Sequence, residues 1–74
     1  MELRNLEIKL SERELQIIKL MAEGMSNAEI GNHIFISFHT VKAEIEKLYG
    51  KFEVHNRIQL IIKAIRLGII SADM

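Results

Sequence analysis

Apolar positions recur at helical spacing along most of the chain. From residue 11 onward, apolar side chains return every three or four residues, and each such stretch opens with a residue that can cap a helix. These stretches predict four helices at about residues 11–23, 26–33, 37–52 and 56–67. Because the sequence has no proline and no hairpin signal, we predict an all-α fold.

Two of the predicted helix starts carry a capping box, in which a serine and a glutamate three residues later bond each other's backbone N–H groups. Ser11 and Glu14 form one in "LSEREL", and Ser26 and Glu29 form another in "MSNAEI". The pattern indicates one domain over residues 11–70 and a C-terminal tail at 71–74. Residues 1–10 alternate weakly in "LEIKL", and we interpret them as a linker or a short additional helix.

Composition narrows the classes of function. The chain has 74 residues and no cysteine, and His33, His39 and His55 lack the i, i+4 spacing of a helical metal site, so we expect neither a disulfide nor a metal or other cofactor. No apolar run approaches about 18 residues, which predicts a cytoplasmic protein with no membrane partner. Ten basic and ten acidic residues cancel, so attraction to an anionic partner depends on where the charges lie.

Catalytic patterns are not found in the sequence. It offers no nucleophile with a base and an orienting third group, no glycine loop that could hold a phosphate, and little room for a pocket. We therefore predict that the chain is not an enzyme and has no small-molecule site.

The second and third predicted helices have the spacing of a helix-turn-helix, which sets an amphipathic recognition helix into the DNA major groove. On spacing alone, a plain helical bundle is an equally good interpretation.

The sequence from "LSERE" to "LGII" resembles the LuxR-type (GerE-like) DNA-binding domain of bacterial transcription regulators over about sixty residues. The resemblance rests on "LSERE", "SNAEI", "IFIS", "TVK", "KLYGKFEV" and the closing "LGII", which follow one another without gaps. It implies sequence-specific binding of double-stranded DNA by residues 37–52 in a bacterial cytoplasm, associated with the nucleoid. RNA polymerase is a further candidate partner, and in the family a receiver or ligand-binding domain often precedes this one.

The resemblance also implies DNA-binding residues. Thr40 and Lys42 stand in the "TVK" element that enters the groove, and Lys51 matches a basic phosphate contact of the family. Asn27 resembles a position that can meet a phosphate at a helix N-terminus, although a first-turn residue beside the cap is an equally good reading. His39 is a first-turn surface residue that can touch phosphate.

A helical projection at about 100° per residue, centred on Val41, places an outward arc opposite the buried face. The arc contains Lys42, Ala43, Glu46, Lys47 and Gly50, so we add Ala43, Glu46 and Lys47 to the predicted DNA-binding residues.

Two glutamates and a glycine depart from the family pattern. Glu44 stands where the family usually has histidine and lies near the border of the core, where we expect it to pair with a cation. Glu46 can accept from a cytosine amino group but repels phosphates, and Gly50 replaces a usually basic residue. We expect weak, salt-sensitive DNA binding, and a protein-interaction module that has lost DNA binding is the alternative.

The fourth predicted helix is apolar over more than half of its circumference. Ile58, Ile62 and Ile65 lie outside the set that packs inward in the family, so we predict that they form a homodimer interface; a larger core that includes residues 3–10 is the alternative. Glu14 and Arg57 resemble a family pair that ties the first helix to the fourth, which we predict to be structural.

Overall fold

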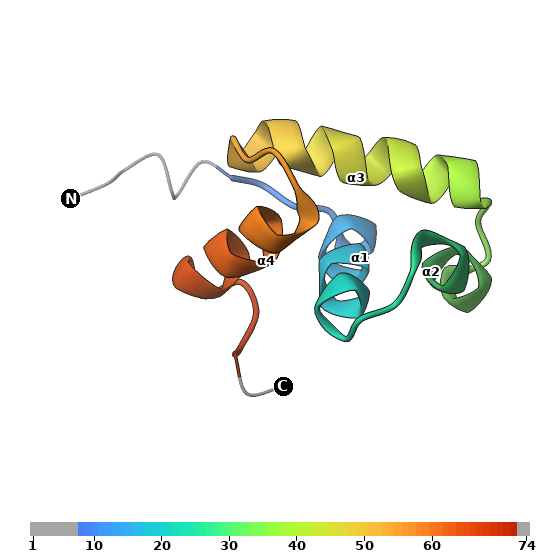
Figure 1. Cartoon of the computed structure of the whole chain (residues 1–74), viewed down its shortest axis with the longest axis horizontal. Coiled ribbons are helices and arrows are strands. Elements are labelled where there is room, and N and C mark those ends of the chain that lie inside the picture. Colours follow the sequence, from blue (N-terminus) through green and yellow to red (C-terminus); the bar gives the residue numbers. More distant parts are fainter. Residues whose placement is uncertain (1–7, 73–74) are drawn as a thin grey trace.

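Four helices make up the fold (Figure 1). The computed structural model describes residues 8–72, and over that range it contains no strand. The helices are α1 (Glu12–Ala22), α2 (Asn27–Ile34), α3 (Phe38–Phe52) and α4 (Arg57–Arg66). The all-α prediction and all four helices are confirmed, with each end within about two residues of its predicted position. Of residues 3–10, which the larger-core alternative includes, residues 3–7 lie outside the described residues.

Both predicted capping boxes are present. At the start of α1, the Glu14 N–H donates to Ser11 Oγ at 3.0 Å, and the Ser11 N–H donates to Glu14 Oε1 at 2.9 Å. At α2 the equivalent bonds between Ser26 and Glu29 measure 3.1 and 2.8 Å. Satisfying these first-turn N–H groups fixes where each helix begins.

The starts of α3 and α4 are capped from one side chain each. The Thr40 N–H donates to Ser37 Oγ at 3.0 Å, and the Gln59 N–H donates to Asn56 Oδ1 at 2.9 Å. The Gln59 side chain accepts from the His55 N–H at 2.8 Å, one residue earlier than in a capping box.

The helix ends differ in what supplies the left-handed residue. Gly24 (φ 93°) and Gly68 (φ 76°) do so near the ends of α1 and α4. Phe35 (φ 64°) and Glu53 (φ 58°) take the same conformation after α2 and α3. Left-handed backbone is uncommon for residues with a side chain, so their sequence gave no signal for these two ends.

The core lies beneath α3, the longest helix, which runs across α1, α2 and α4 (Figure 1). The apolar stripe of α3, buried residues of the other helices and Ile70 after α4 together form the core: Ile17, Ile18, Leu20, Met21, Ile30, Val41, Ile45, Leu48, Phe52, Leu60, Ala64 and Ile70. Ile8 and Leu10 pack against this core without forming a helix. The described part of the N-terminal segment, residues 8–10, is therefore a non-helical segment that covers part of the core.

Close packing between α2 and α3 depends on Gly31, which is buried. A Cβ atom at Gly31 would lie 2.6 Å from the Ile36 carbonyl oxygen. The absence of a side chain lets the turn fold back directly against α2, and this sets where α3 begins.

None of the helices within residues 8–72 is both long enough and apolar enough to cross a membrane.

Candidate nucleic-acid interface

The outward side of α3 is exposed along its whole length. We call the exposed residues Lys42, Ala43, Glu46, Lys47 and Gly50 the open arc. The opposite side of the helix carries Val41, Ile45, Leu48 and Phe52, all buried. Burial of that stripe fixes the rotation of the helix, so the open arc points to solvent as the projection predicts.

The charged side chains of the open arc form no hydrogen bond or ion pair with described residues, although the charge of Lys47 helps to lower the pKa of Glu44. Within residues 8–72, Lys42, Glu46 and Lys47 take part in no side-chain hydrogen bond or ion pair. Their charges are therefore available to a partner, and the two lysines exceed the single glutamate by one positive charge.

Thr40 and His39, two predicted DNA-binding residues at the start of α3, each interact with a nearby residue of the same segment. Thr40 is half-buried, and its Oγ1 lies 2.9 Å from Ser37 Oγ in a hydrogen bond. The His39 ring lies 4.8 Å from the ring of Phe38, tilted by 57°. Asn27 is the first residue of α2 and is half-buried, at a helix N-terminus as expected.

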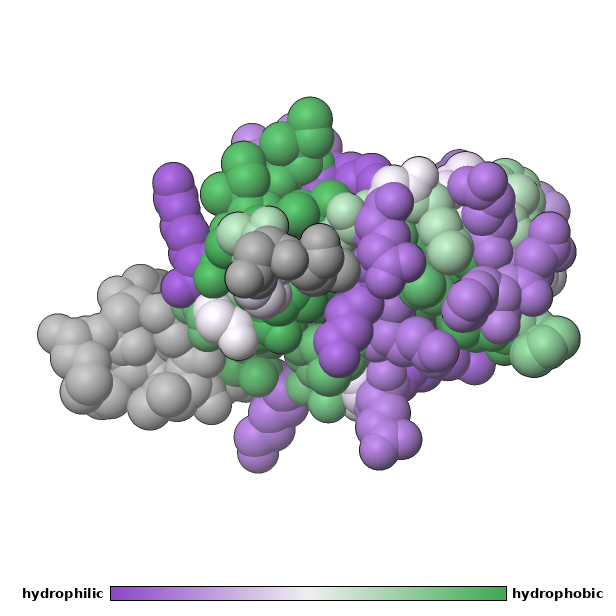
Figure 2. All heavy atoms as spheres, turned by 90° about the horizontal axis from the view of Figure 1, so that it is seen from below, coloured by the Kyte–Doolittle hydropathy of each residue, from purple (hydrophilic) through white to green (hydrophobic). Residues whose placement is uncertain are grey.

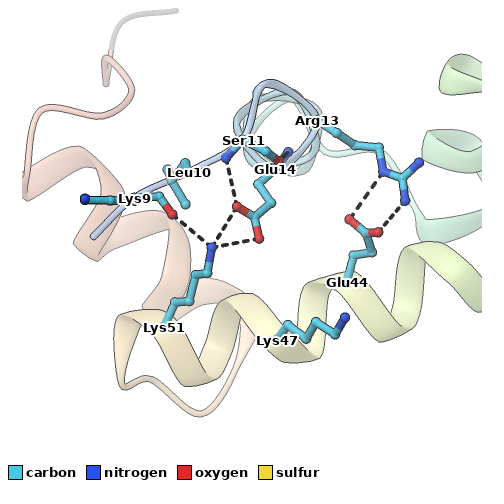
Figure 3. A pocket seen from close by; sticks show the side chains of 8 residues that line it. All are labelled: Lys9, Leu10, Ser11, Arg13, Glu14, Glu44, Lys47 and Lys51. Carbon is cyan, nitrogen blue, oxygen red and sulfur yellow. Dashed lines mark hydrogen bonds and ion pairs between the residues drawn. The ribbon is translucent and has the colours of Figure 1, made fainter. Parts of the chain in front are cut away.

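Glu44 lies on the other side of α3, toward α1, and is paired with Arg13 (Figure 3). Arg13 Nε donates to Glu44 Oε1 at 3.4 Å, and Nη2 donates to Oε2. This hydrogen-bonded pair lowers the pKa of Glu44 against the opposing effect of desolvation, and it raises the pKa of Arg13. The cation expected beside Glu44 is thus found on α1.

Lys51 is held on the same side, which we call the α1-facing flank (Glu44 and Lys51). Its Nζ donates to both carboxylate oxygens of Glu14, at 2.9 and 3.0 Å, and to the Lys9 carbonyl oxygen at 2.9 Å (Figure 3). Partial burial raises the pKa of Glu14, but the bonds from Lys51 and Ser11 outweigh it, so this pKa lies below its usual value. Lys51, for which the resemblance predicts a phosphate contact, is therefore engaged within the domain.

The predicted pair of Glu14 and Arg57 is wrong. Glu14 bonds Lys51, whereas Arg57 Nη2 donates to the Met21 carbonyl oxygen at 3.0 Å and to the Met25 carbonyl oxygen. The physical reason is that Arg57 meets two backbone carbonyl oxygens, one at the end of α1 and one on the residue before the Ser26 cap, and a cation is favourable near a helix C-terminus. Arg57 still ties α1 to α4, but its acceptors are backbone atoms, which no sequence pattern marks.

A hollow between α1 and α3 gathers these charges and is drawn in Figure 3. Four cations and two carboxylates surround it, together with two uncharged residues: Lys9, Leu10, Ser11, Arg13, Glu14, Glu44, Lys47 and Lys51. Because both carboxylates are already paired with cations, we assign the hollow a structural role.

The exposed face of α4 is apolar. Ile58 is 70% exposed and Ile62 is 45% exposed, whereas Ile65 packs in part against the core of its own domain. Figure 2 shows apolar atoms gathered over the end of the molecule that α4 occupies. The larger-core alternative is therefore consistent with Ile65, which the core partly covers. Among the described residues nothing covers Ile58 and Ile62 in this way, and both stay exposed.

Lys63, on the polar strip of α4, donates to the Phe52 carbonyl oxygen at 2.6 Å. This bond satisfies a carbonyl group at the end of α3, so Lys63 links α4 to α3.

Comparison with known sequences agrees with this architecture. Residues 9–64 match the family described as bacterial regulatory proteins, luxR family. The chain is similar to the transcriptional regulatory protein LiaR of Bacillus subtilis, with 44% identity over 57 residues that make up 77% of this chain and 27% of LiaR. It is also similar to the response regulator protein VraR of Staphylococcus aureus, with 39% identity over 61 residues, or 82% of this chain and 29% of VraR.

The chain spans between a quarter and a third of the length of these two relatives. The matched region includes all of α1, α2 and α3 and most of α4. On this evidence the chain belongs to the luxR family of bacterial regulatory proteins, a family of regulators rather than of enzymes.

Proposed function

We propose that this chain binds double-stranded DNA by laying α3 in the major groove, as the DNA-binding part of a bacterial transcription regulator. The observation that carries the proposal is the open arc, where two unpaired lysines stand on a helix whose opposite side is buried. An exposed helix of this kind, preceded by a short helix and a tight turn, is the arrangement that docks in a groove. The similarity to the transcriptional regulatory protein LiaR and the response regulator protein VraR supports the same function.

The electrostatic attraction of a single copy is small. Lys42 and Lys47 oppose Glu46 on the open arc, and Lys51 is engaged with Glu14. Because each phosphate contact by a cation adds to affinity, two free lysines give weak binding that salt abolishes.

We propose that two copies bind together through Ile58 and Ile62 of α4. Two exposed isoleucines one helical turn apart make a self-complementary apolar patch, as a two-fold interface requires. Linking two weak sites raises affinity through effective concentration, and a two-fold arrangement predicts a roughly palindromic site with half-sites about one DNA turn apart.

Titration of a fluorescent duplex at several salt concentrations tests DNA binding. We expect the logarithm of the binding constant to fall linearly with the logarithm of salt, with a slope of about 0.9 per phosphate contacted. If duplexes of many sequences are ignored in dilute buffer, the proposal is wrong. That result would favour a protein-docking module, for which Phe35 (91% exposed) and Phe38 (47% exposed) offer an apolar surface.

Sedimentation of Ile62→Asp tests the dimer. We expect this variant to stay helical, sediment as a monomer and lose duplex affinity. Gln16→Asp is the matched control, because it places the same charge at an exposed position on α1. Association of Ile62→Asp equal to that of the control would rule out an interface on α4.

A further inference from the structure

We infer that Glu46 selects a cytosine in the DNA site, by accepting a hydrogen bond from the cytosine amino group in the major groove. This inference rests on the proposed function and adds to it a specificity-determining residue and the base that it reads.

The two glutamates of α3 differ in whether their carboxylates are available. Glu44 accepts two hydrogen bonds from Arg13, so its acceptor oxygens are occupied within the domain. Glu46 is exposed, and no described residue hydrogen-bonds or pairs with its side chain. A carboxylate on a surface that also carries lysines weakens the attraction of that surface to phosphates. Glu46 therefore lowers the affinity for DNA of any sequence.

The neighbours of Glu46 let it come close to the base edges. At about 100° per residue, Ala43 and Gly50 lie about 10° from the direction opposite the buried stripe, Glu46 about 50° and Lys42 about 90°. A Cβ atom added at Gly50 would meet nothing within 4 Å, so packing inside the domain does not require glycine there. With two small residues at the point of closest approach, the helix backbone can sit deep enough for a glutamate, which is one bond shorter than lysine, to reach the groove floor.

The chemistry of the base edges selects cytosine. In the major groove cytosine presents an amino donor, guanine presents two acceptors, and thymine presents an acceptor and a methyl group. Adenine has an amino donor beside the N7 acceptor, which repels the second oxygen of a carboxylate. Cytosine is therefore the base whose edge matches an ionised glutamate, and Lys42, nearer the rim of the arc, is placed for the phosphates.

Selection of bound duplexes from a random library, with wild type, Glu46→Gln and Glu46→Ala, tests the inference. We expect wild type to retain a cytosine at one position of each half-site. Replacing that C·G pair by T·A should weaken wild-type binding by on the order of tenfold, because a carboxylate would then face an acceptor. Glu46→Gln should prefer adenine there, since an amide can bond both N6 and N7, and Glu46→Ala should show no preference and tighter non-specific binding.

Glu23→Gln is the matched control, because Glu23 is an exposed glutamate at the end of α1 and its loss should leave the base profile of wild type unchanged. Circular dichroism establishes that each variant is folded. If Glu46→Gln and Glu46→Ala select the same bases as wild type, the inference is wrong while DNA binding stands. If wild type binds no duplex at low salt, the proposed function fails and this inference fails with it.

Discussion

The two sides of α3 carry similar charged residues, yet their surroundings differ. On the α1-facing flank, Glu44 pairs with Arg13, and Lys51 bonds Glu14 and the Lys9 carbonyl group. On the open arc, Lys42, Glu46 and Lys47 form no hydrogen bond or ion pair with another described residue, although Lys47 also lines the hollow beside Glu44. The flank contributes to holding α3 on α1, and the arc is left for a partner.

This difference shows that a count of charges along a helix does not measure what the helix offers. From Ser37 to Phe52 there are three lysines and two glutamates, a net charge of +1. Removing the internally paired Lys51 and Glu44 leaves two lysines and one glutamate, again +1. The net charge is the same, but the lysines available to phosphates fall from three to two, and the salt dependence of binding should fall with them.

Lys42→Ala should have the largest effect on the open arc. We expect duplex affinity to fall about tenfold in dilute buffer and the salt slope to decrease by about 0.9, because one phosphate contact is lost. Fluorescence titration at four salt concentrations measures both quantities. An unchanged slope would mean that Lys42 does not meet the DNA backbone.

Gly50→Ala should stabilise the fold by about 1 kcal/mol, because alanine is the better helix former and its Cβ meets open space. Gly31→Ala makes the same change where a Cβ would lie 2.6 Å from the Ile36 carbonyl oxygen, and it should destabilise the fold. Urea denaturation gives the free energy of unfolding of each variant. Equal shifts in both would contradict the assignment of Gly50 to an open surface.

Lys51→Met should lower the free energy of unfolding by about 1 kcal/mol or less, since its bonds to Glu14 and Lys9 are partly exposed. It should leave the salt slope of DNA binding unchanged. Lys47→Met is the control one turn away: it should leave stability nearly unchanged and reduce the salt slope. If Lys51→Met also reduces the slope, Lys51 reaches DNA after all and the two sides of α3 do not divide as described.

Acidification should weaken the α1-facing flank by a small amount. The pKa values of Glu14 and Glu44 lie below the usual 4.5, so their stabilisation is complete above pH 4.5 and is lost as pH falls through the lower folded-state values. Melting temperatures of wild type between pH 6 and pH 3 should therefore fall more steeply than those of a Glu14→Gln, Glu44→Gln double variant. Equal steepness would show that these two pairs do not stabilise the fold.

The sequence predicted the helices well because their signals are local. Ser11 with Glu14 and Ser26 with Glu29 mark helix starts within four residues, and the Val41 to Phe52 stripe fixes the rotation of α3. The charged contacts were harder because they join distant segments: Lys51 reaches Glu14 across 37 positions, and only packing decides which cation a carboxylate meets. The family resemblance therefore gave the wrong partner for Glu14, which bonds Lys51 and not Arg57. For Glu44 the sequence predicted a cation as partner, but it did not identify that cation as Arg13.

The bonds of Arg57 bear on how two copies would be spaced. Arg57, one residue before the exposed Ile58, bonds the first turn of α4 to the carbonyl groups of Met21 at the end of α1 and of Met25 directly before the cap of α2. The α4 face proposed for pairing is thus anchored to the segment between α1 and α2. With a rigid link of this kind, pairing of two copies through α4 would fix the distance between their α3 helices. The separation of the two half-sites would then be fixed as well, with little tolerance for an inserted base pair.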